Sequence, residues 1–127
     1  MTFILLSVDQ VAGLHDAVLN AGELQGKARD TSLAGALARV DHRLAYGMIA
    51  DVFDLAAAYA EAIAQGRCFN DGNKRTAFRV MHVCLVMHGA QIPLDENDIG
   101  PRINDLAQGR TAAQDMAVWL RDIAQDG

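Results

Sequence analysis

The chain has few cysteines, prolines and aromatic residues, and it has no long apolar run. Its two cysteines, Cys68 and Cys84, form no Cys-x-x-Cys pair, which argues against a zinc site or a disulfide framework and favours reduced thiols. The apolar run at residues 3–6 is too short for a signal sequence or a membrane span. We therefore expect a cytoplasmic protein that makes no contact with a membrane.

Positive charge is also scarce, because the formal net charge is −5. The basic residues are scattered, except for Lys74, Arg75 and Arg79. Binding to a nucleic acid depends on neutralising many phosphates, so this charge distribution gives it little support. We expect no direct nucleic-acid partner.

Apolar residues make up 51% of the chain and charged residues 21%, as in soluble globular proteins. With 127 residues the chain can enclose one hydrophobic core, which predicts a single domain over residues 1–127. Aromatic residues are only 6%, whereas alanines are many. Alanine is the best helix former and allows helices to approach closely, so the composition predicts an all-α fold.

Apolar periodicity and capping residues divide the first half of the chain. Ser7 and Gln10 have the spacing of a capping box, which predicts the start of a helix that Gly22 stops. The polar stretch Glu23–Arg29 predicts a loop or a small hairpin flap, with an ordinary connector equally favoured. Asp30 or Thr31 is expected to cap the next, short helix.

Two longer segments follow. Apolar positions from Leu44 to Ile63 have helical spacing and predict the longest amphipathic helix. Thr76–His88 is apolar on nearly every side, which predicts a buried central helix as the axis of the bundle. Asp95, and Thr111 with Gln114, are expected to cap two final helices.

Between these two segments lies a polar loop, residues 66–76, that has the composition of a phosphate site. It places glycine, basic side chains and a carboxylate directly before a helix N-terminus, where free N–H groups and the helix dipole favour anions. Gly72 permits close backbone approach, Lys74 and Arg75 are donors, and Asp71 can hold Mg²⁺. By composition alone, a capped surface turn with solvated charges is the favoured interpretation.

The order of residues in this loop is more specific than its composition. Phe69-Asn70-Asp71-Gly72-Asn73-Lys74-Arg75 resembles the signature of the Fic/Doc family, His-x-Phe-x-(Asp/Glu)-(Gly/Ala)-Asn-x-x followed by arginine. The flanking segments Leu14–Ala17, Ala45–Tyr46 and Asn73–Ala77 resemble the death-on-curing (Doc) branch of that family. The resemblance extends over essentially the whole chain and implies a compact Fic-type helical bundle.

The resemblance also implies roles for single residues. The family's carboxylate coordinates magnesium and its phenylalanine anchors the loop in the core, roles that fall on Asp71 and Phe69. The implied cofactors are ATP and Mg²⁺. The residues expected at the phosphates and the nucleotide are Gly72, Asn73, Lys74 and Arg75.

At two positions the chain departs from the pattern of the adenylyl-transferring members of the family, and both positions bear on the reaction. Adenylyl-transferring members usually have glycine at the position of Lys74 and a second arginine at the position of Phe78. A lysine is typical of the Doc branch, which implies transfer of the γ-phosphoryl group of ATP to a threonine of elongation factor Tu. The branch also implies a partner, an antitoxin of the prevent-host-death type that folds as a helix in a groove of the toxin. Adenylyl transfer is the alternative within enzymes.

Arg67 stands where the family has its catalytic histidine. Its guanidinium stays protonated and offers only donors, so it cannot accept the proton of an attacking hydroxyl. Loss of general-base catalysis typically costs about 10²–10⁴ in rate, so we expect an inactive or crippled enzyme. A lesion selected in cells or introduced by design is favoured, ahead of a naturally inactive relative and a rewired site. A non-catalytic module that binds nucleotide or antitoxin is the alternative outside enzymes, and no role for His15 follows from the sequence.

Overall fold

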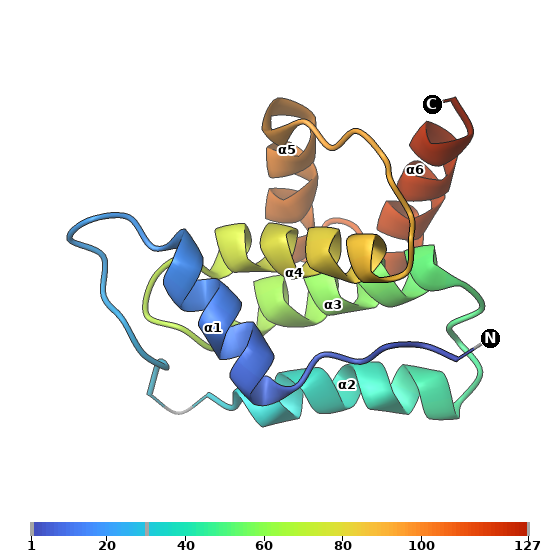
Figure 1. The fold of residues 1–127 in the computed structure, drawn as a ribbon. Coiled ribbons are helices and arrows are strands. Elements are labelled where there is room, and N and C mark those ends of the chain that lie inside the picture. Colours follow the sequence, from blue (N-terminus) through green and yellow to red (C-terminus); the bar gives the residue numbers. More distant parts are fainter. Residues whose placement is uncertain (1, 30, 127) are drawn as a thin grey trace.

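The computed structural model describes residues 2–29 and 31–126, and helices dominate these ranges (Figure 1). The described residues form no β-strand, and their one β-type pairing is an isolated antiparallel bridge between Lys27 and Phe69. The all-α prediction is confirmed. The helices in chain order are α1 (Val8–Val18), α2 (Leu33–Ala45), α3 (Val52–Gly66), α4 (Asn73–Met87), α5 (Glu96–Ala107) and α6 (Ala113–Asp126).

The helix that contacts most of the others is α3, which packs against α2, α4, α5 and α6, and not the predicted segment Thr76–His88. It lies beside α4 and runs in the opposite direction, with α2 beneath and α5 and α6 on the far side of the pair (Figure 1). All its residues from Leu55 to Ala60 are buried, whereas Val86 of α4 is 54% exposed. Alanines contribute to the difference, because their small side chains allow α3 to be packed closely on every side.

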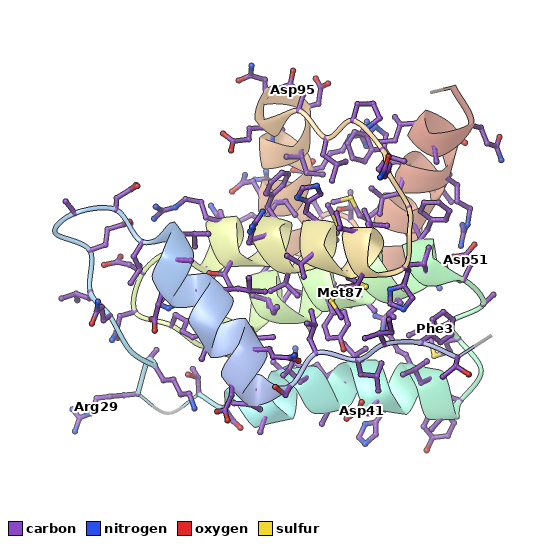
Figure 2. All side chains as sticks on the ribbon, in the orientation of Figure 1. Phe3, Arg29, Asp41, Asp51, Met87 and Asp95 are labelled. Atoms are coloured by element: carbon purple, nitrogen blue, oxygen red, sulfur yellow. The ribbon has the colours of Figure 1, made fainter. Side chains whose placement is uncertain are left out.

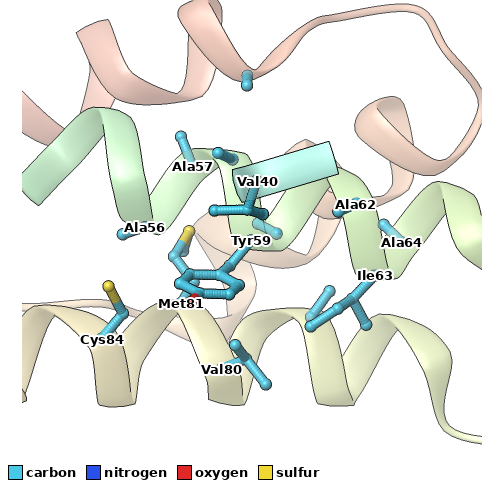
Figure 3. Packing of buried hydrophobic residues seen from close by; sticks show 14 of the residues in the cluster. Val40, Ala56, Ala57, Tyr59, Ala62, Ile63, Ala64, Val80, Met81 and Cys84 are labelled. Carbon is cyan, nitrogen blue, oxygen red and sulfur yellow. The ribbon is translucent and has the colours of Figure 1, made fainter. Parts of the chain in front are cut away.

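The core lies on both sides of α3 (Figure 3). Tyr59 projects from α3 among buried side chains of α2 and α4, including Val40 and Met81. Its hydroxyl accepts the N–H of Leu6 at 2.9 Å, which fixes the N-terminal segment to the core. Burial raises the pKa of Tyr59, and it raises that of the unpaired Cys84 thiol to about 12. Both groups are therefore neutral at physiological pH.

The predicted boundaries of the first two helices are partly right. Ser7 and Gln10 form the predicted capping box of α1, but the helix ends at Val18 because Leu19 is already extended, well before Gly22. The cap of α2 is Ser32, whose Oγ accepts the N–H of Gly35 at 2.9 Å. The hydroxyl of Thr31 instead donates to the carbonyl of Ala28, so Thr31 is not the cap. Asp30, the other expected cap, lies outside the described residues.

The predicted helix from Leu44 to Ile63 is interrupted. A turn that includes Gly47, with φ +71°, separates α2 from α3, and Asp51 caps α3. The two helices share one apolar pattern because both face the same core. α3 and α4 have 15 residues each, so α3 is not longer than its partner.

The last two helices rise steeply from the pair formed by α3 and α4 (Figure 1). Asp95 caps α5 as predicted and lies at its outer tip (Figure 2). Thr111 does not cap α6, because the helix begins two residues later and the N–H of Ala113 donates to Glu61 of α3 at 2.5 Å. No helix in the described ranges is long and apolar enough to span a membrane.

Arg121 of α6 connects the end of the chain to the start of α3. It donates to both carboxylate oxygens of Asp51, at 2.8 and 3.2 Å, and also pairs with Asp54. Asp51 Oδ1 in addition accepts the N–H of Asp54 at 2.9 Å, as the helix cap. The hydrogen bond from Arg121 lowers the pKa of Asp51.

The double role of Asp51 predicts that Asp51→Ala lowers the free energy of unfolding by about 1–2 kcal/mol at neutral pH, because the substitution removes the cap and a partly exposed ion pair. Because the pKa of Asp51 is lowered, its stabilising effect is complete above the ordinary value of 3.8 and is lost as the pH falls below it. Urea unfolding at neutral and acid pH measures both effects. Asp122→Ala, an exposed position on α6, is the control, and an equal effect of the two substitutions would contradict this assignment.

Candidate functional site

Residues 67–72 reverse the chain between α3 and α4, and their ends have left-handed backbone conformations. Gly72 has φ +79°, which suits glycine. Arg67 has φ +48° and ψ +44°, and it is the one described non-glycine residue with a positive φ. That conformation costs an L-residue about 1–2 kcal/mol, and strain of this kind gathers at functional sites.

Asn73 closes this loop. Its Oδ1 accepts the N–H of Phe69 at 3.0 Å and its Nδ2 donates to the carbonyl of Phe69 at 2.8 Å. Phe69 is buried, as expected of a residue that anchors the loop. The side chain of Asn73 is therefore engaged within the loop. Its backbone N–H is the group that can contribute to a site at the N-terminus of α4.

The N-terminus of α4 has no side-chain cap. Gly72 occupies the N-cap position, and the first hydrogen bond of the helix runs from the N–H of Thr76 to the carbonyl of Gly72 at 2.9 Å. The N–H groups of the first turn, from Asn73 to Arg75, have no partner within the helix. An anion at this terminus would gain these hydrogen bonds and the field of the helix dipole.

Two cationic side chains lie beside this terminus and already have protein partners. Lys74 Nζ donates to Asn104 Oδ1 of α5 at 2.6 Å. Arg75 donates to the carbonyl of Val18 at 2.9 Å, at the end of α1, and pairs with Glu23. The hydrogen bond from Arg75 lowers the pKa of Glu23, so the pair is fully charged at neutral pH. A phosphate that binds Arg75 must compete with Glu23.

A cavity of about 660 Å³ adjoins the same terminus, between α1, α4 and α5. Lys74, Arg75 and Arg79 line it together with Glu96, and apolar side chains form much of the remaining wall. These apolar residues are Val18, Phe78, Ile99 and Ile103. Sequence reasoning missed the contribution of α5, because the link from Lys74 to Asn104 spans 30 positions without any local pattern.

The stretch Glu23–Arg29 pairs with the loop and does not form a hairpin of its own. Lys27 bridges Phe69, the N–H of Ala28 donates to the carbonyl of Cys68 at 2.8 Å, and the N–H of Asn70 donates to the carbonyl of Gly26 at 3.2 Å. We call this segment the flap. Its outer end, Arg29, points away from the rest of the molecule (Figure 2).

Asp71 lies between the flap and α4. Its Oδ2 accepts the N–H of Leu24 at 2.9 Å, and the residue is half-buried. The described ranges contain no group of three or more His, Cys, Asp or Glu side chains that could hold a metal ion. Mg²⁺ is commonly bound through one or two carboxylates with waters and substrate phosphates, so Asp71 fits a magnesium–nucleotide complex. A metal site formed by protein ligands alone does not fit these residues.

The histidines differ in their surroundings, and no role for His15 followed from the sequence. His15 is buried, stacks on Phe69 and lies 2.6 Å from the carbonyl oxygen of Asp71 through Nε2. His88, at the end of α4, bonds to the N–H of Ile4 at 2.9 Å and to the carbonyl of Cys84 at 2.7 Å. Both of its ring nitrogens are therefore engaged in contacts that support the fold.

Comparison with known proteins identifies the family. The model of the Fic/DOC family matches residues 5–85, more than half of the chain, and this region includes α1, the flap and the loop before α4. The chain belongs to the Fic/DOC family. This Fic/DOC chain is similar to "Protein kinase doc" of Escherichia phage P1, with 32% identity over 117 residues, 91% of this chain and 92% of that protein. The similarity thus extends beyond the family model into α5 and α6.

The closure of the loop by Asn73 predicts that Asn73→Ala lowers the free energy of unfolding by about 1–3 kcal/mol, because it leaves the buried N–H and carbonyl of Phe69 without partners. Chemical unfolding followed by circular dichroism measures the change. Asn97→Ala, at an exposed position in the first turn of α5, is the matched control. Equal unfolding midpoints for the two variants would show that Asn73 does not close the loop in solution.

Proposed function

We propose that this Fic/DOC chain is the toxin of a type II toxin–antitoxin pair. It is built as a protein phosphotransferase that uses Mg-ATP to phosphorylate a threonine of elongation factor Tu, which arrests translation and growth. In the present form Arg67 disables or cripples the reaction. The observation that carries this proposal is the uncapped N-terminus of α4, flanked by Lys74 and Arg75 and adjoining a cavity.

The terminus and the cavity together suit a nucleotide. The backbone N–H groups from Asn73 to Arg75 offer several donors to phosphate oxygens, and Gly72 has no side chain to block their approach. The cavity volume, about 660 Å³, lies within the range of small-molecule sites. Its mixture of cationic and apolar walls fits a ligand with an anionic end and a flat, weakly polar end.

Asp71 is the residue that would hold magnesium. When bound, Mg²⁺ neutralises charge on the phosphate oxygens. The chain's own contribution is to hold the Asp71 carboxylate close to the helix N-terminus, since the N–H of Leu24 fixes one carboxylate oxygen at 2.9 Å. Lys74 and Arg75 add positive charge on the same side, once a phosphate replaces Asn104 and Glu23 as their partner.

The reaction proposed is transfer of the γ-phosphoryl group. The hydroxyl oxygen of threonine forms a bond to the γ-phosphorus, the bond to the bridging oxygen breaks, ADP leaves, and the hydroxyl proton passes to a base. Lys74 and Phe78 support phosphoryl over adenylyl transfer, and the similar phage protein is named a kinase. Phe78 lines the cavity, where the adenylyl-transferring pattern has its second arginine.

Arg67 is the reason to expect little activity in this form. It is exposed at the start of the loop, and its guanidinium cannot accept a proton. Restoration of a histidine at this position supplies the missing acceptor. The same observation supports the second candidate function, a module that binds nucleotide or antitoxin without catalysing a reaction.

The proposed partner is an antitoxin of the prevent-host-death type that binds as a helix. Val18, Phe78, Ile99 and Ile103 give the cavity between α1, α4 and α5 an apolar wall on which such a helix can dock. A helix in this position would cover Lys74 and Arg75. Inhibition would then follow from exclusion of the nucleotide.

The proposed activity predicts that Arg67→His adds one phosphoryl group to purified elongation factor Tu in the presence of Mg-ATP, whereas the unaltered chain adds about 10²–10⁴ times less per unit time. Intact-mass analysis measures the product. Arg67→Gln is the matched control, because glutamine removes the positive charge without supplying a base, and it should remain as inactive as the unaltered chain.

Addition of a nucleoside monophosphate would establish adenylyl transfer instead. An unmodified substrate with all three proteins would contradict the proposed phosphotransferase and favour the non-catalytic module. Equal activity of Arg67→Gln and Arg67→His would show that the charge of Arg67, not the lack of a base, blocks the reaction.

A further inference from the structure

His15 projects from α1 against the loop and lies beside Phe69, Asp71 and Gly72. Its Nε2 lies 2.6 Å from the carbonyl oxygen of Asp71, and its ring stacks on Phe69 with centroids 3.8 Å apart and planes inclined by 7°. A Cβ atom added at Gly72 would lie 3.6 Å from the same ring. The side chain is 1% exposed. α1 therefore supports the loop through one buried imidazole.

The hydrogen bond defines which nitrogen of His15 carries a proton. A carbonyl oxygen only accepts, so Nε2 must donate to Asp71. The lone pair of the neutral ring then lies on Nδ1, which is buried, so a substrate hydroxyl has no access to it. His15 therefore does not replace the missing acceptor at Arg67, although it lies close to the loop.

The other nitrogen argues against a role in packing alone. Nδ1 is buried and makes no hydrogen bond, and its charged neighbour, Asp16 Oδ1 on α1, lies 3.4 Å away. A buried polar atom without a partner costs about 1–3 kcal/mol, which an apolar ring of the same shape would avoid. A histidine at this position is explained by the hydrogen bond that its Nε2 makes.

The contact with Asp71 controls the direction of a second group. The carbonyl of Asp71 and the N–H of Gly72 belong to one planar trans peptide, so they point in opposite directions. When His15 holds the carbonyl, the N–H of Gly72 is directed away from α1. The same peptide joins Asp71 to Gly72, the N-cap of α4, so its orientation affects how the Asp71 carboxylate is placed relative to the N-terminus of the helix.

We propose that His15 is a positioning residue of the phosphate site: its Nε2–H holds the Asp71–Gly72 peptide so that the Asp71 carboxylate and the backbone amides at the N-terminus of α4 face the same phosphate. The inference rests on the proposed nucleotide site for its effect on binding. Its structural part, the bond from His15 to the loop, stands independently of any ligand.

Two variants separate the hydrogen bond from the ring. His15→Phe keeps an aromatic ring against Phe69 and loses the donor, whereas His15→Gln loses the ring and keeps an N–H near the position of Nε2. Both are made in the Arg67→His form, and their Kd for Mg-ATP is measured by calorimetry. Because His15→Phe loses one hydrogen bond, we expect it to bind Mg-ATP with a roughly tenfold weaker Kd than the Arg67→His parent. The Kd of His15→Gln should lie between these two values, closer to that of the parent.

The opposite order would overturn the proposal. If His15→Phe binds like the parent and His15→Gln is impaired, the ring matters and the donor does not. Thermal unfolding of each variant shows whether it is folded, so that a weaker Kd is not mistaken for loss of structure.

A measurement on the unaltered chain tests the structural part without nucleotide. Nitrogen-15 NMR of the imidazole should show His15 protonated at Nε2, and His15→Phe should shift the amide signal of Gly72. A histidine protonated at Nδ1 alone would contradict the proposal. If the Arg67→His form binds no nucleotide, the proposed function fails. The imidazole signal of His15 and the amide signal of Gly72 still decide whether His15 donates its hydrogen bond to the loop.

Discussion

The packing of α3 against α4 in opposite directions is the interaction on which the rest of the structure depends. It places the end of one helix beside the start of the next, so residues 67–72 must reverse the chain within a short distance. That reversal uses left-handed conformations at Arg67 and Gly72. Glycine at the N-cap then leaves the first N–H groups of α4 without a side-chain partner. The phosphate site proposed here is thus a consequence of how the two central helices are joined.

The charged groups around this terminus are satisfied within the protein. Asp71 accepts a hydrogen bond from the flap, Arg75 pairs with Glu23, and Lys74 reaches Asn104 on α5. Asp71 and Arg75 are half-buried, and polar groups in such surroundings are usually hydrogen-bonded. Two of these partners, Leu24 and Glu23, belong to the flap and the third belongs to α5, so binding of a phosphate would release contacts to the flap and to α5 together. Affinity then depends on the strength of these internal pairs as well as on the contacts with the ligand.

Sequence reasoning found some of the short-range hydrogen bonds, and it failed where packing between distant segments decides the structure. The caps at Ser7 and Asp95 were predicted correctly because each bond joins residues two or three positions apart. The central helix was assigned wrongly because both α3 and α4 are rich in apolar residues, and contacts between distant segments decide which of the two most other helices pack against. The contact between His15 and Asp71 spans 56 positions and has no pattern in one sequence. The loop was recognised through its order of residues, and its geometry came only from the structure.

The central claim is that the N-terminus of α4 binds phosphate, and an NMR titration of the unaltered chain with ATP, with and without Mg²⁺, tests it most directly. The account predicts that the backbone amide signals from Gly72 to Arg75 shift first and most, that those of Glu23 and Leu24 follow as the flap loses its contacts, and that Mg²⁺ strengthens the effect through Asp71. Signals that remain unchanged at saturating ATP, or that shift mainly in α2 and α6, would contradict the account.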